Sequence, residues 1–410
     1  MPFSHVKEVL HSYCTSPQLC IALLLCMLIG AVGCNSADTN EPATDAPATD
    51  APTDKPTEAP TDKPTEKPTE KPTEKPTDAP VELEEMFYYF PENAFLFKKY
   101  GRMQETDEGL RCDPAGAGLE FSGIMKGEVI LELEVDKNTY FTVFVDGERI
   151  DERFRVTPDD KQITLVDFGE EQGEHNVRVL KQTEAKRSLC TITAVTLTGI
   201  LEEAPADKQF YIEFIGDSIT SGTGIFGNSS TGGMDGTELQ DATSNYAFQT
   251  AEALGADFSL VSCSSIGICS GWNSYIEKDY YPCASYFRDT EEKYDFERVP
   301  DLVVINLGTN DQSKGCKDKD FKARVEELVN LVRDSYGENV EILWIYDMMN
   351  YGKQDLVLAT LDEMGGELMG LYTLKVTRNN NGGTSHPDLK AHGVVAQQLI
   401  DFIEENYLLY

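Results

Sequence analysis

The stretch DLVVINL at residues 301–307 decides the fold class of this 410-residue chain. An unbroken apolar run of this length is typical of a strand that is buried on both faces, as in a parallel sheet. The polar residues Gly308-Thr309-Asn310-Asp311 follow it directly. Functional sites in parallel α/β sheets gather at the carboxyl ends of strands. The stretch therefore predicts a parallel α/β fold and places candidate functional residues at the end of this strand.

On both sides of this stretch, strand-like runs alternate with helical ones. Strands are predicted at residues 210–215, 258–261, 340–346 and 371–376, and helices at residues 245–254, 321–336 and 393–406. The apolar residues of the 321–336 segment recur on one face, as in an amphipathic helix. This order predicts a three-layer α/β domain over residues 206–410, with a parallel sheet and helices on both faces.

Residues 83–205 have a different, all-β pattern. The runs at 128–134 and 140–145 alternate or are rich in β-branched and aromatic residues, which favours strands. Asp146-Gly147 follows directly and is a strong hairpin signal. Further strands are predicted at residues 162–166, 175–180 and 191–198. Their spacing indicates a β-sandwich, and no catalytic motif stands out in it.

The first 33 residues resemble an export signal, with a short apolar run that ends in small residues. Ala31-Val32-Gly33-Cys34 is similar to a bacterial lipobox, which predicts Cys34 as the lipidated first residue. An ordinary signal peptide that is cut nearby, or an uncleaved anchor, is the alternative. We therefore expect a bacterial cell-surface lipoprotein or a secreted protein.

Residues 34–82 repeat Thr, an acidic residue, Lys or Ala, and Pro. Such a segment has little to bury and favours extended conformations, which predicts a semi-rigid spacer with a reach on the order of 100 Å. The spacer suits an enzyme that acts on a bulky, immobile substrate, and it is equally compatible with any other cargo.

The charge of the chain excludes some partners. Asp and Glu number 71 against 35 Lys and Arg, a net charge of −36. An acidic surface repels phosphate backbones and anionic headgroups, so neither a nucleic-acid partner nor a membrane contact beyond the lipid anchor is expected. The sequence contains no Cys-x-x-Cys, so no metal site is predicted.

A nucleophile and a base are predicted in two distant segments. The 210–215 strand runs into Gly216-Asp217-Ser218, which places Ser218 at a strand-to-loop turn, where it is a nucleophile if a base accepts its proton. His386 precedes the last helix and is the candidate base. His175 and His392 are interpreted as structural.

Two further residues at strand ends are candidate oxyanion donors. The Asn310 side chain follows the 301–307 strand, although an Asx-turn is the simpler explanation of an Asn there. Gly267 follows the 258–261 strand, where the absence of a side chain lets a backbone N–H approach a ligand. The Ser218 N–H is the third candidate donor.

Taken together, these blocks resemble those of the SGNH (GDSL) hydrolases, and Ser218, Gly267, Asn310 and His386 match that pattern. With a β-sandwich ahead of the catalytic domain, residues 85–410 are similar to the family-two carbohydrate esterases. The resemblance implies a jelly-roll sandwich, an SGNH domain and removal of O-acetyl groups from polysaccharides such as xylan and glucomannan. It implies serine catalysis without a cofactor.

One position departs from the SGNH pattern. The family places Asp three residues before the histidine, where this chain has Gly383. Some members of the resembled family use a Ser–His dyad in which a backbone carbonyl holds the imidazole, and we expect that arrangement for His386. The alternative orienting group is Asp388, which is also placed to cap the following helix.

Trp272 and Tyr351 are candidate sugar-stacking residues, against the alternative that they pack the domain. The Gly222–Gly227 stretch fits GxGxxG, but the polar segment after it argues against a nucleotide site. Two other functions stay open. The chain could be an SGNH lipase or thioesterase, or a surface carbohydrate-binding lipoprotein that has lost turnover.

Overall fold

The computed structural model describes residues 82–150, 153–231, 236–312, 315–349, 352–406 and 408–409. The chain divides into two units, residues 1–77 and residues 78–410, and the description below concerns the second. The predicted export signal, Cys34 and nearly all of the spacer lie outside the described residues. None of the helices described is long and apolar enough to cross a lipid bilayer.

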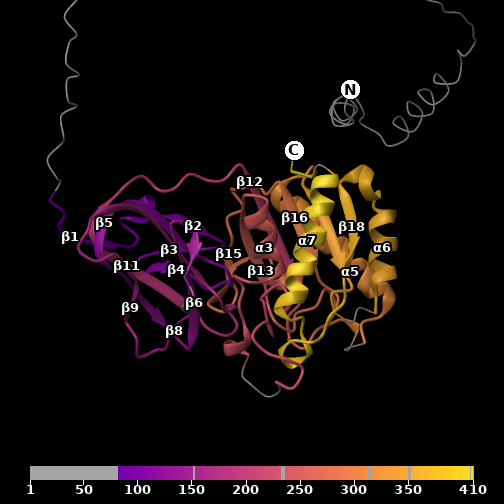
Figure 1. The fold of residues 1–410 in the computed structure, drawn as a ribbon. Coiled ribbons are helices and arrows are strands. Elements are labelled where there is room, and N and C mark those ends of the chain that lie inside the picture. Colours follow the sequence, from indigo (N-terminus) through magenta and orange to yellow (C-terminus); the bar gives the residue numbers. More distant parts are fainter. Residues whose placement is uncertain are drawn as a thin grey trace, which may run out of the picture. The chain divides into compact units, whose positions relative to one another are not determined.

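The N-terminal part of the second unit is an antiparallel β-sandwich (purple in Figure 1). Its strands are β1 (Glu85–Tyr89), β2 (Lys98–Tyr100), β3 (Gln104–Thr106), β4 (Gly109–Arg111), β5 (Gly118–Val135), β6 (Thr139–Val145), β7 (Glu148–Arg149), β8 (Phe154–Val156), β9 (Gln162–Asp167), β10 (Gly173–Lys181) and β11 (Cys190–Leu201). They pair in the order β3-β4-β11-β5-β10-β6-β7, with β1, β2, β8 and β9 off this path. The long strand β5 pairs with β2, β9, β10 and β11. Its buried side chains belong to the single apolar core of the sandwich.

The predicted hairpin joins β6 to β7. Asp146 and Gly147 both have positive φ, 52° and 84°, which is what a two-residue type I′ turn requires. Each strand expected between residues 83 and 205 is present. The local alternation of side chains was therefore sufficient to identify them.

The C-terminal part is an α/β domain built on five parallel strands. These are β12 (Phe210–Gly216), β13 (Ala256–Ser262), β16 (Leu302–Asn306), β17 (Glu341–Tyr346) and β18 (Leu371–Lys375). Their order is β13-β12-β16-β17-β18. The order reverses on either side of β12, and such a switch point is where open α/β sheets place their sites. The 301–307 stretch supplies β16, which is buried along its whole length.

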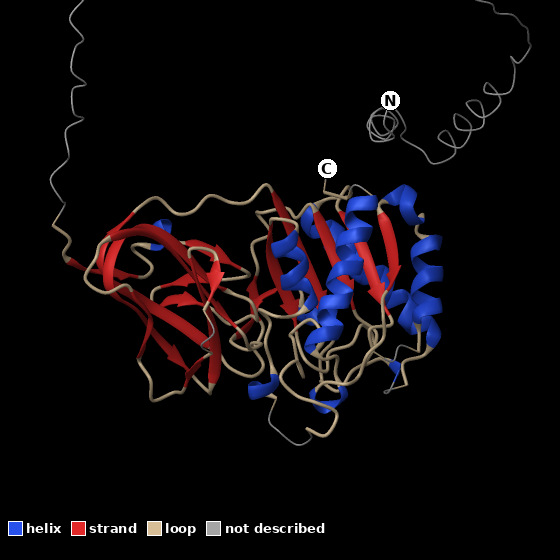
Figure 2. Ribbon diagram, viewed as in Figure 1, coloured by secondary structure: helices blue, strands red, loops and turns tan. Residues whose placement is uncertain are grey.

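Helices cover both faces of this sheet, as Figure 2 shows. They are α3 (Tyr246–Ala253), α5 (Asp318–Tyr336), α6 (Gln354–Glu363) and α7 (Leu389–Glu405), with a single turn, α4, at Glu277–Tyr280. Phe214 and Val304 pack in the cluster that contains residues of α3 and α7. Ile215 and Ile305, one position further along each strand, pack in the cluster that contains residues of α5. Successive side chains of a strand point to opposite faces of the sheet, so each strand contributes to the apolar core on both faces.

Helices α5 and α7 begin before their predicted limits, and the single turn α4 was not predicted. Helix α7 begins at Leu389 rather than Gly393 because the Asp388 side chain accepts the Ala391 N–H at 2.8 Å and caps it. Helix α5 begins three residues before Phe321, with Asp318 and Asp320 in its first turn, where acidic side chains are favourable. Helix α6 was not predicted either.

Buried ion pairs join the sandwich to the α/β domain. Arg102 contacts Glu213 at 3.1 Å, and Lys98 contacts Asp257 at 2.7 Å. A third pair, between the buried Arg178 and the partly exposed Glu252 at 2.7 Å, connects β10 to α3. Each basic residue belongs to the sandwich and each carboxylate to the α/β domain, so the interface is charge-complementary.

Candidate active site

Ser218 lies in the turn that follows β12. The Cβ of any larger residue at Gly216 would fall 2.0 Å from the Thr220 Oγ1, so the turn requires glycine there. Ser218 is 9% exposed, and its Oγ lies 2.7 Å from the His386 Nε2. The structure thus brings the predicted nucleophile and base into hydrogen-bond contact across 168 residues of sequence.

Thr384 orients the His386 ring. The His386 Nδ1 lies 2.9 Å from the Thr384 Oγ1 and 3.2 Å from the Thr384 backbone oxygen. The Thr384 hydroxyl donates its own hydrogen to the Gly383 carbonyl at 2.7 Å, so it can only accept from Nδ1. This network assigns the imidazole proton to Nδ1 and leaves Nε2 free to accept the Ser218 proton.

Burial lowers the pKa of His386 below its ordinary value, although its contacts with the Thr384 backbone oppose this. The ring is therefore neutral at neutral pH, the state that a general base requires. Within the described residues, no carboxylate makes a hydrogen bond to the ring. Asp388, the alternative orienting group, caps α7 instead.

Gly383, which stands where the SGNH pattern has Asp, is tightly packed against two neighbouring segments. A Cβ at this position would lie 2.9 Å from the Leu239 Cδ1 and 3.1 Å from the Gly227 Cα. Gly224, with φ of 89°, packs against the same loop and would place a Cβ 2.6 Å from that of His386. Gly224 and Gly227 of the GxGxxG stretch therefore allow the loop after Ser218 to pack closely against the loop that contains Gly383 and His386.

The ends of three neighbouring strands, β13, β12 and β16, supply the candidate oxyanion donors. Within the described residues, neither the Ser218 N–H nor the Gly267 N–H donates a hydrogen bond, so both remain available for a ligand. A Cβ at Gly267 would lie 1.7 Å from the Ser270 carbonyl oxygen. The fold of this loop therefore requires glycine at position 267, while the role of its N–H as an oxyanion donor stays a prediction.

Asn310 joins the same three strand ends. Its amide donates to the Asp217 Oδ2 at 3.1 Å and to the Ile266 carbonyl at 2.8 Å. Both amide hydrogens thus have acceptors here, and donation to an oxyanion would require one of them to be shared. Burial raises the pKa of Asp217 to about 7.

Sequence models of two families match the chain in the same order as its two folded domains. The model of the carbohydrate esterase 2 N-terminal domain matches residues 99–205, and that of the GDSL-like lipase/acylhydrolase family matches residues 214–367. The chain thus combines a GDSL-like lipase/acylhydrolase domain with a carbohydrate esterase 2 N-terminal domain. A further model, the PT disordered repeat, matches residues 47–82.

Individual proteins similar to this chain include carbohydrate esterases. Cellulase/esterase CelE of Acetivibrio thermocellus is 27% identical over 315 residues, which cover 73% of this chain and 38% of CelE. An acetylxylan esterase/glucomannan deacetylase of Cellvibrio japonicus is 26% identical over 237 residues, 55% of this chain and 66% of that enzyme. The matched region is therefore less than two thirds of either relative.

A solved structure is similar over both domains. A family two carbohydrate esterase from Clostridium thermocellum, in complex with cellohexaose, superposes with a TM-score of 0.71 at 25% identity. The match covers 77% of this chain and 100% of that one. The predicted resemblance to the family-two carbohydrate esterases is confirmed, as is the predicted fold class.

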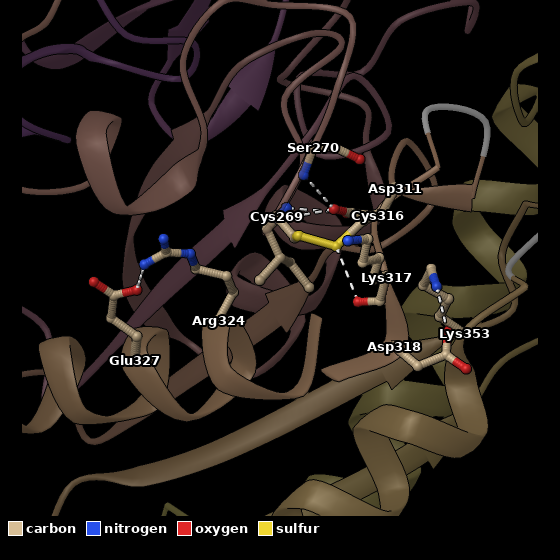
Figure 3. Close-up of a disulfide and its surroundings, with 10 residues drawn as sticks. Cys269, Ser270, Asp311, Cys316, Lys317, Asp318, Arg324, Glu327 and Lys353 are labelled. Atoms are coloured by element: carbon tan, nitrogen blue, oxygen red, sulfur yellow. Dashed lines mark hydrogen bonds and ion pairs between the residues drawn. A yellow bond between two sulfur atoms is a disulfide. The ribbon is translucent and has the colours of Figure 1, made fainter. Parts of the chain in front are cut away.

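Sequence reasoning missed the role of Asp311 in the acylhydrolase domain. Its carboxylate accepts the N–H groups of Ile268, Cys269 and Ser270 at 2.8–2.9 Å, and these residues directly follow Gly267. A disulfide between Cys269 and Cys316 closes the same loop (Figure 3). The position of Asp311 after Asn310 was the available signal, whereas the disulfide pairing had none.

The predicted aromatic contacts are only partly described. Trp272 is 62% exposed and donates its backbone N–H to the Ser265 carbonyl at 2.9 Å, while Tyr351 lies outside the described residues. His392 is structural, as predicted: it is fully buried, and its Nδ1 accepts the Tyr246 N–H at the start of α3. Among the described residues, His, Cys, Asp and Glu side chains form no group of three that could hold a metal ion.

Proposed function

We propose that this chain is a serine esterase that removes O-acetyl groups from plant cell-wall polysaccharides such as xylan or glucomannan. The observation that carries the proposal is the 2.7 Å contact between the Ser218 Oγ and a His386 Nε2 that has no proton of its own. The activities named for the similar Acetivibrio and Cellvibrio proteins support the acetyl group and the polysaccharide. The exposed Trp272 offers a ring for a sugar to stack on.

In the proposed reaction, the Ser218 Oγ attacks the acetyl carbonyl carbon while the His386 Nε2 takes the hydroxyl proton. The Ser218 and Gly267 N–H groups, with Asn310 when one of its amide hydrogens is free, stabilise the oxyanion. The imidazolium then protonates the leaving sugar oxygen as the C–O bond breaks. Water, activated by His386, attacks the acetyl-serine ester and releases acetate.

The predicted export signal, the predicted lipobox at Cys34 and the predicted spacer support a place outside the cell, either on the surface through a lipid anchor or in the medium. An insoluble polysaccharide cannot diffuse to an enzyme. A tether of the kind predicted for residues 34–82 would let the acylhydrolase domain reach it. Release of the protein into the medium without detergent would contradict the anchor but leave the esterase proposal intact.

The test is acetate release from acetylated xylan, acetylated glucomannan and O-acetylated peptidoglycan, with wild type and Ser218→Ala compared side by side. Release from a plant polymer by wild type and not by the variant is expected. Faster hydrolysis of octanoyl than of acetyl nitrophenyl ester would favour a lipase. Binding to polymer without acetate release would favour a non-catalytic surface protein.

A further inference from the structure

A loop of the N-terminal domain is buried inside the acylhydrolase site. It joins β10 to β11, and the fully buried Lys181 sets its shape. The Lys181 ammonium donates to the carbonyl oxygens of Asp113, Thr183 and Ser188 at 2.8–2.9 Å. A buried cation that binds three backbone carbonyls holds the loop in one conformation, and at its centre lies Glu184.

The Glu184 side chain is fully buried and accepts hydrogen bonds on both of its oxygens. Oε2 accepts the Ser264 N–H at 2.5 Å and the Ser221 hydroxyl at 3.3 Å. Oε1 accepts the Gln240 amide at 3.1 Å and the Arg187 guanidinium at 3.3 Å. A buried carboxylate with this many donors is fully satisfied and holds each of them in place.

The two partners of Oε2 belong to the two loops that carry the reaction. Ser221 lies three residues after Ser218, and Ser264 lies three residues before Gly267. The single hydroxyl hydrogen of Ser221 is shared between the Glu184 Oε2 and the nearer Ser262 Oγ, which lies 2.9 Å away at the end of β13. Glu184 thus connects the nucleophile turn to the loop that carries an oxyanion donor.

Lys186, two residues further along, holds the second loop from another direction. Its ammonium donates to the Ser264 carbonyl and to the Asn273 side chain, both at 2.8 Å. Ser264 is therefore held at its N–H by Glu184 and at its carbonyl by Lys186. Both anchors come from the N-terminal domain.

The charge of Glu184 also acts on the catalytic base. Burial lowers the pKa of His386, the negative charge of Glu184 opposes that effect, and the positive charge of Arg187 adds to it. His392 also interacts electrostatically with His386, but it is buried with a pKa of about 3 and is neutral at working pH. Removal of the Glu184 charge therefore favours the neutral imidazole.

We propose that Glu184 is a positioning residue of the esterase site, supplied by the N-terminal domain, which fixes the Ser218 turn and the Gly267 loop relative to each other. The inference rests on the proposed function in taking Ser218 as the nucleophile, His386 as its base and Gly267 as an oxyanion donor. It makes the N-terminal domain a part of the catalytic apparatus rather than an appended binding module.

The experiment compares Glu184→Gln with Glu252→Gln in the full chain, with nitrophenyl acetate as substrate. The glutamine side chain has one oxygen and one NH₂ group where glutamate has two oxygens. The hydrogen-bond donors that contact one of the two Glu184 oxygens would therefore face an NH₂ group, which cannot accept from them. We expect kcat to fall on the order of 10²-fold, as for a small displacement of catalytic groups, with KM little changed. The acid limb of the kcat/KM profile should move to lower pH, which a purely structural defect would not cause.

Glu252→Gln is the matched control because it breaks another carboxylate contact across the same interface, that with Arg178. It should lower stability and leave kcat unchanged. Wild-type kcat and an unmoved acid limb in Glu184→Gln would overturn the proposal, and so would an equal loss of kcat in Glu252→Gln.

A second variant covers the case in which Glu184→Gln does not fold. Ser221→Ala removes one Glu184 contact with a small change of volume and should lower kcat about tenfold, the effect of one buried hydrogen bond. An unchanged kcat would overturn the inference. Nitrophenyl acetate reports on Ser218 whatever the natural polymer is. A wild type that cleaves this ester but no acetylated polysaccharide would therefore refute the proposed substrate and leave the role of Glu184 measurable.

Discussion

The imidazole of His386 keeps its Nδ1 proton between two neutral oxygens of Thr384. Neutral acceptors fix the tautomer and the ring orientation as a carboxylate does, but they stabilise the imidazolium less. Burial acts in the same direction and lowers the pKa of His386. The base is thus well oriented and weakly basic.

This predicts activity on the acid side of neutrality. Protonated His386 cannot accept the Ser218 proton, so kcat/KM is lost as pH falls through the pKa of the folded enzyme. Because that pKa is lowered from 6.5, the midpoint of the acid limb should lie below pH 6.5. Initial rates with nitrophenyl acetate across pH would measure it, and a midpoint above 6.5 would contradict the assignment.

The two candidate orienting residues can be separated by substitution. Thr384→Ala removes the hydroxyl and keeps the carbonyl, so kcat should fall up to about tenfold, the worth of one neutral hydrogen bond. Asp388→Ala removes a helix cap and should lower the free energy of unfolding by about 1 kcal/mol with kcat unchanged. Steady-state kinetics and urea unfolding of both variants test this. A thousandfold loss of kcat in folded Asp388→Ala would make Asp388 the orienting group.

At the scale of elements, the loop after β13 is the one on which most constraints converge. Asp311 binds three of its N–H groups, Glu184 and Lys186 hold Ser264, and the Cys269–Cys316 disulfide ties it to the segment before α5. An oxyanion donor stabilises charge only when it is held in place before the reaction. The constraints on this loop would hold the proposed Gly267 donor in this way.

The disulfide supports a prediction for this loop. It spans 47 residues, and the chain-entropy model then gives a stabilisation of about 4 kcal/mol. The double variant Cys269→Ser, Cys316→Ser should lose stability of that order, and its kcat should fall because the Gly267 N–H is less well held. Urea unfolding and steady-state kinetics would measure the two effects.

A reducing agent supplies the control for the disulfide. Dithiothreitol should bring the wild type to the level of the double serine variant and should not affect that variant further. If reduction leaves the kcat of the wild type unchanged, the disulfide has no part in holding the oxyanion loop.

At the scale of the whole molecule, the sandwich and the α/β domain form one structural unit. Arg102, which is 3% exposed, contacts Glu213, and the hydroxyls of Tyr281 and Tyr336 donate to the same carboxylate at 2.9 and 3.0 Å. Without its cation, the buried Glu213 would be left as an uncompensated charge. Stability is therefore shared between the domains.

Arg102→Met should accordingly lower the free energy of unfolding by about 3–5 kcal/mol, the cost of breaking a buried pair on one side. Lys99→Met, which removes an ion pair between exposed side chains of Lys99 and Glu105, is the control and should cost at most about 1 kcal/mol. Denaturant unfolding followed by fluorescence and circular dichroism would test both. We expect one cooperative transition in the wild type, and two separate transitions would contradict the shared interface.

Local patterns of the sequence determined much of this molecule. Five strands of the sandwich, the five strands of the parallel sheet, helices α3, α5 and α7, the Asp146-Gly147 turn and the positions of Ser218 and His386 at segment ends follow from side-chain periodicity and turn chemistry. These signals act over a few residues. They are therefore present in the sequence whatever the chain packs against.

Only the tertiary structure decided how the site is completed. The Glu184–Ser264 contact joins residues 80 apart in sequence, and the Ser218–His386 contact joins residues 168 apart. Whether His386 turns to Thr384 or to Asp388, and which thiols pair, depends on where the loops dock. The local sequence around a carboxylate or a thiol does not specify its partner, because the interaction depends on distance in space and not on position along the chain.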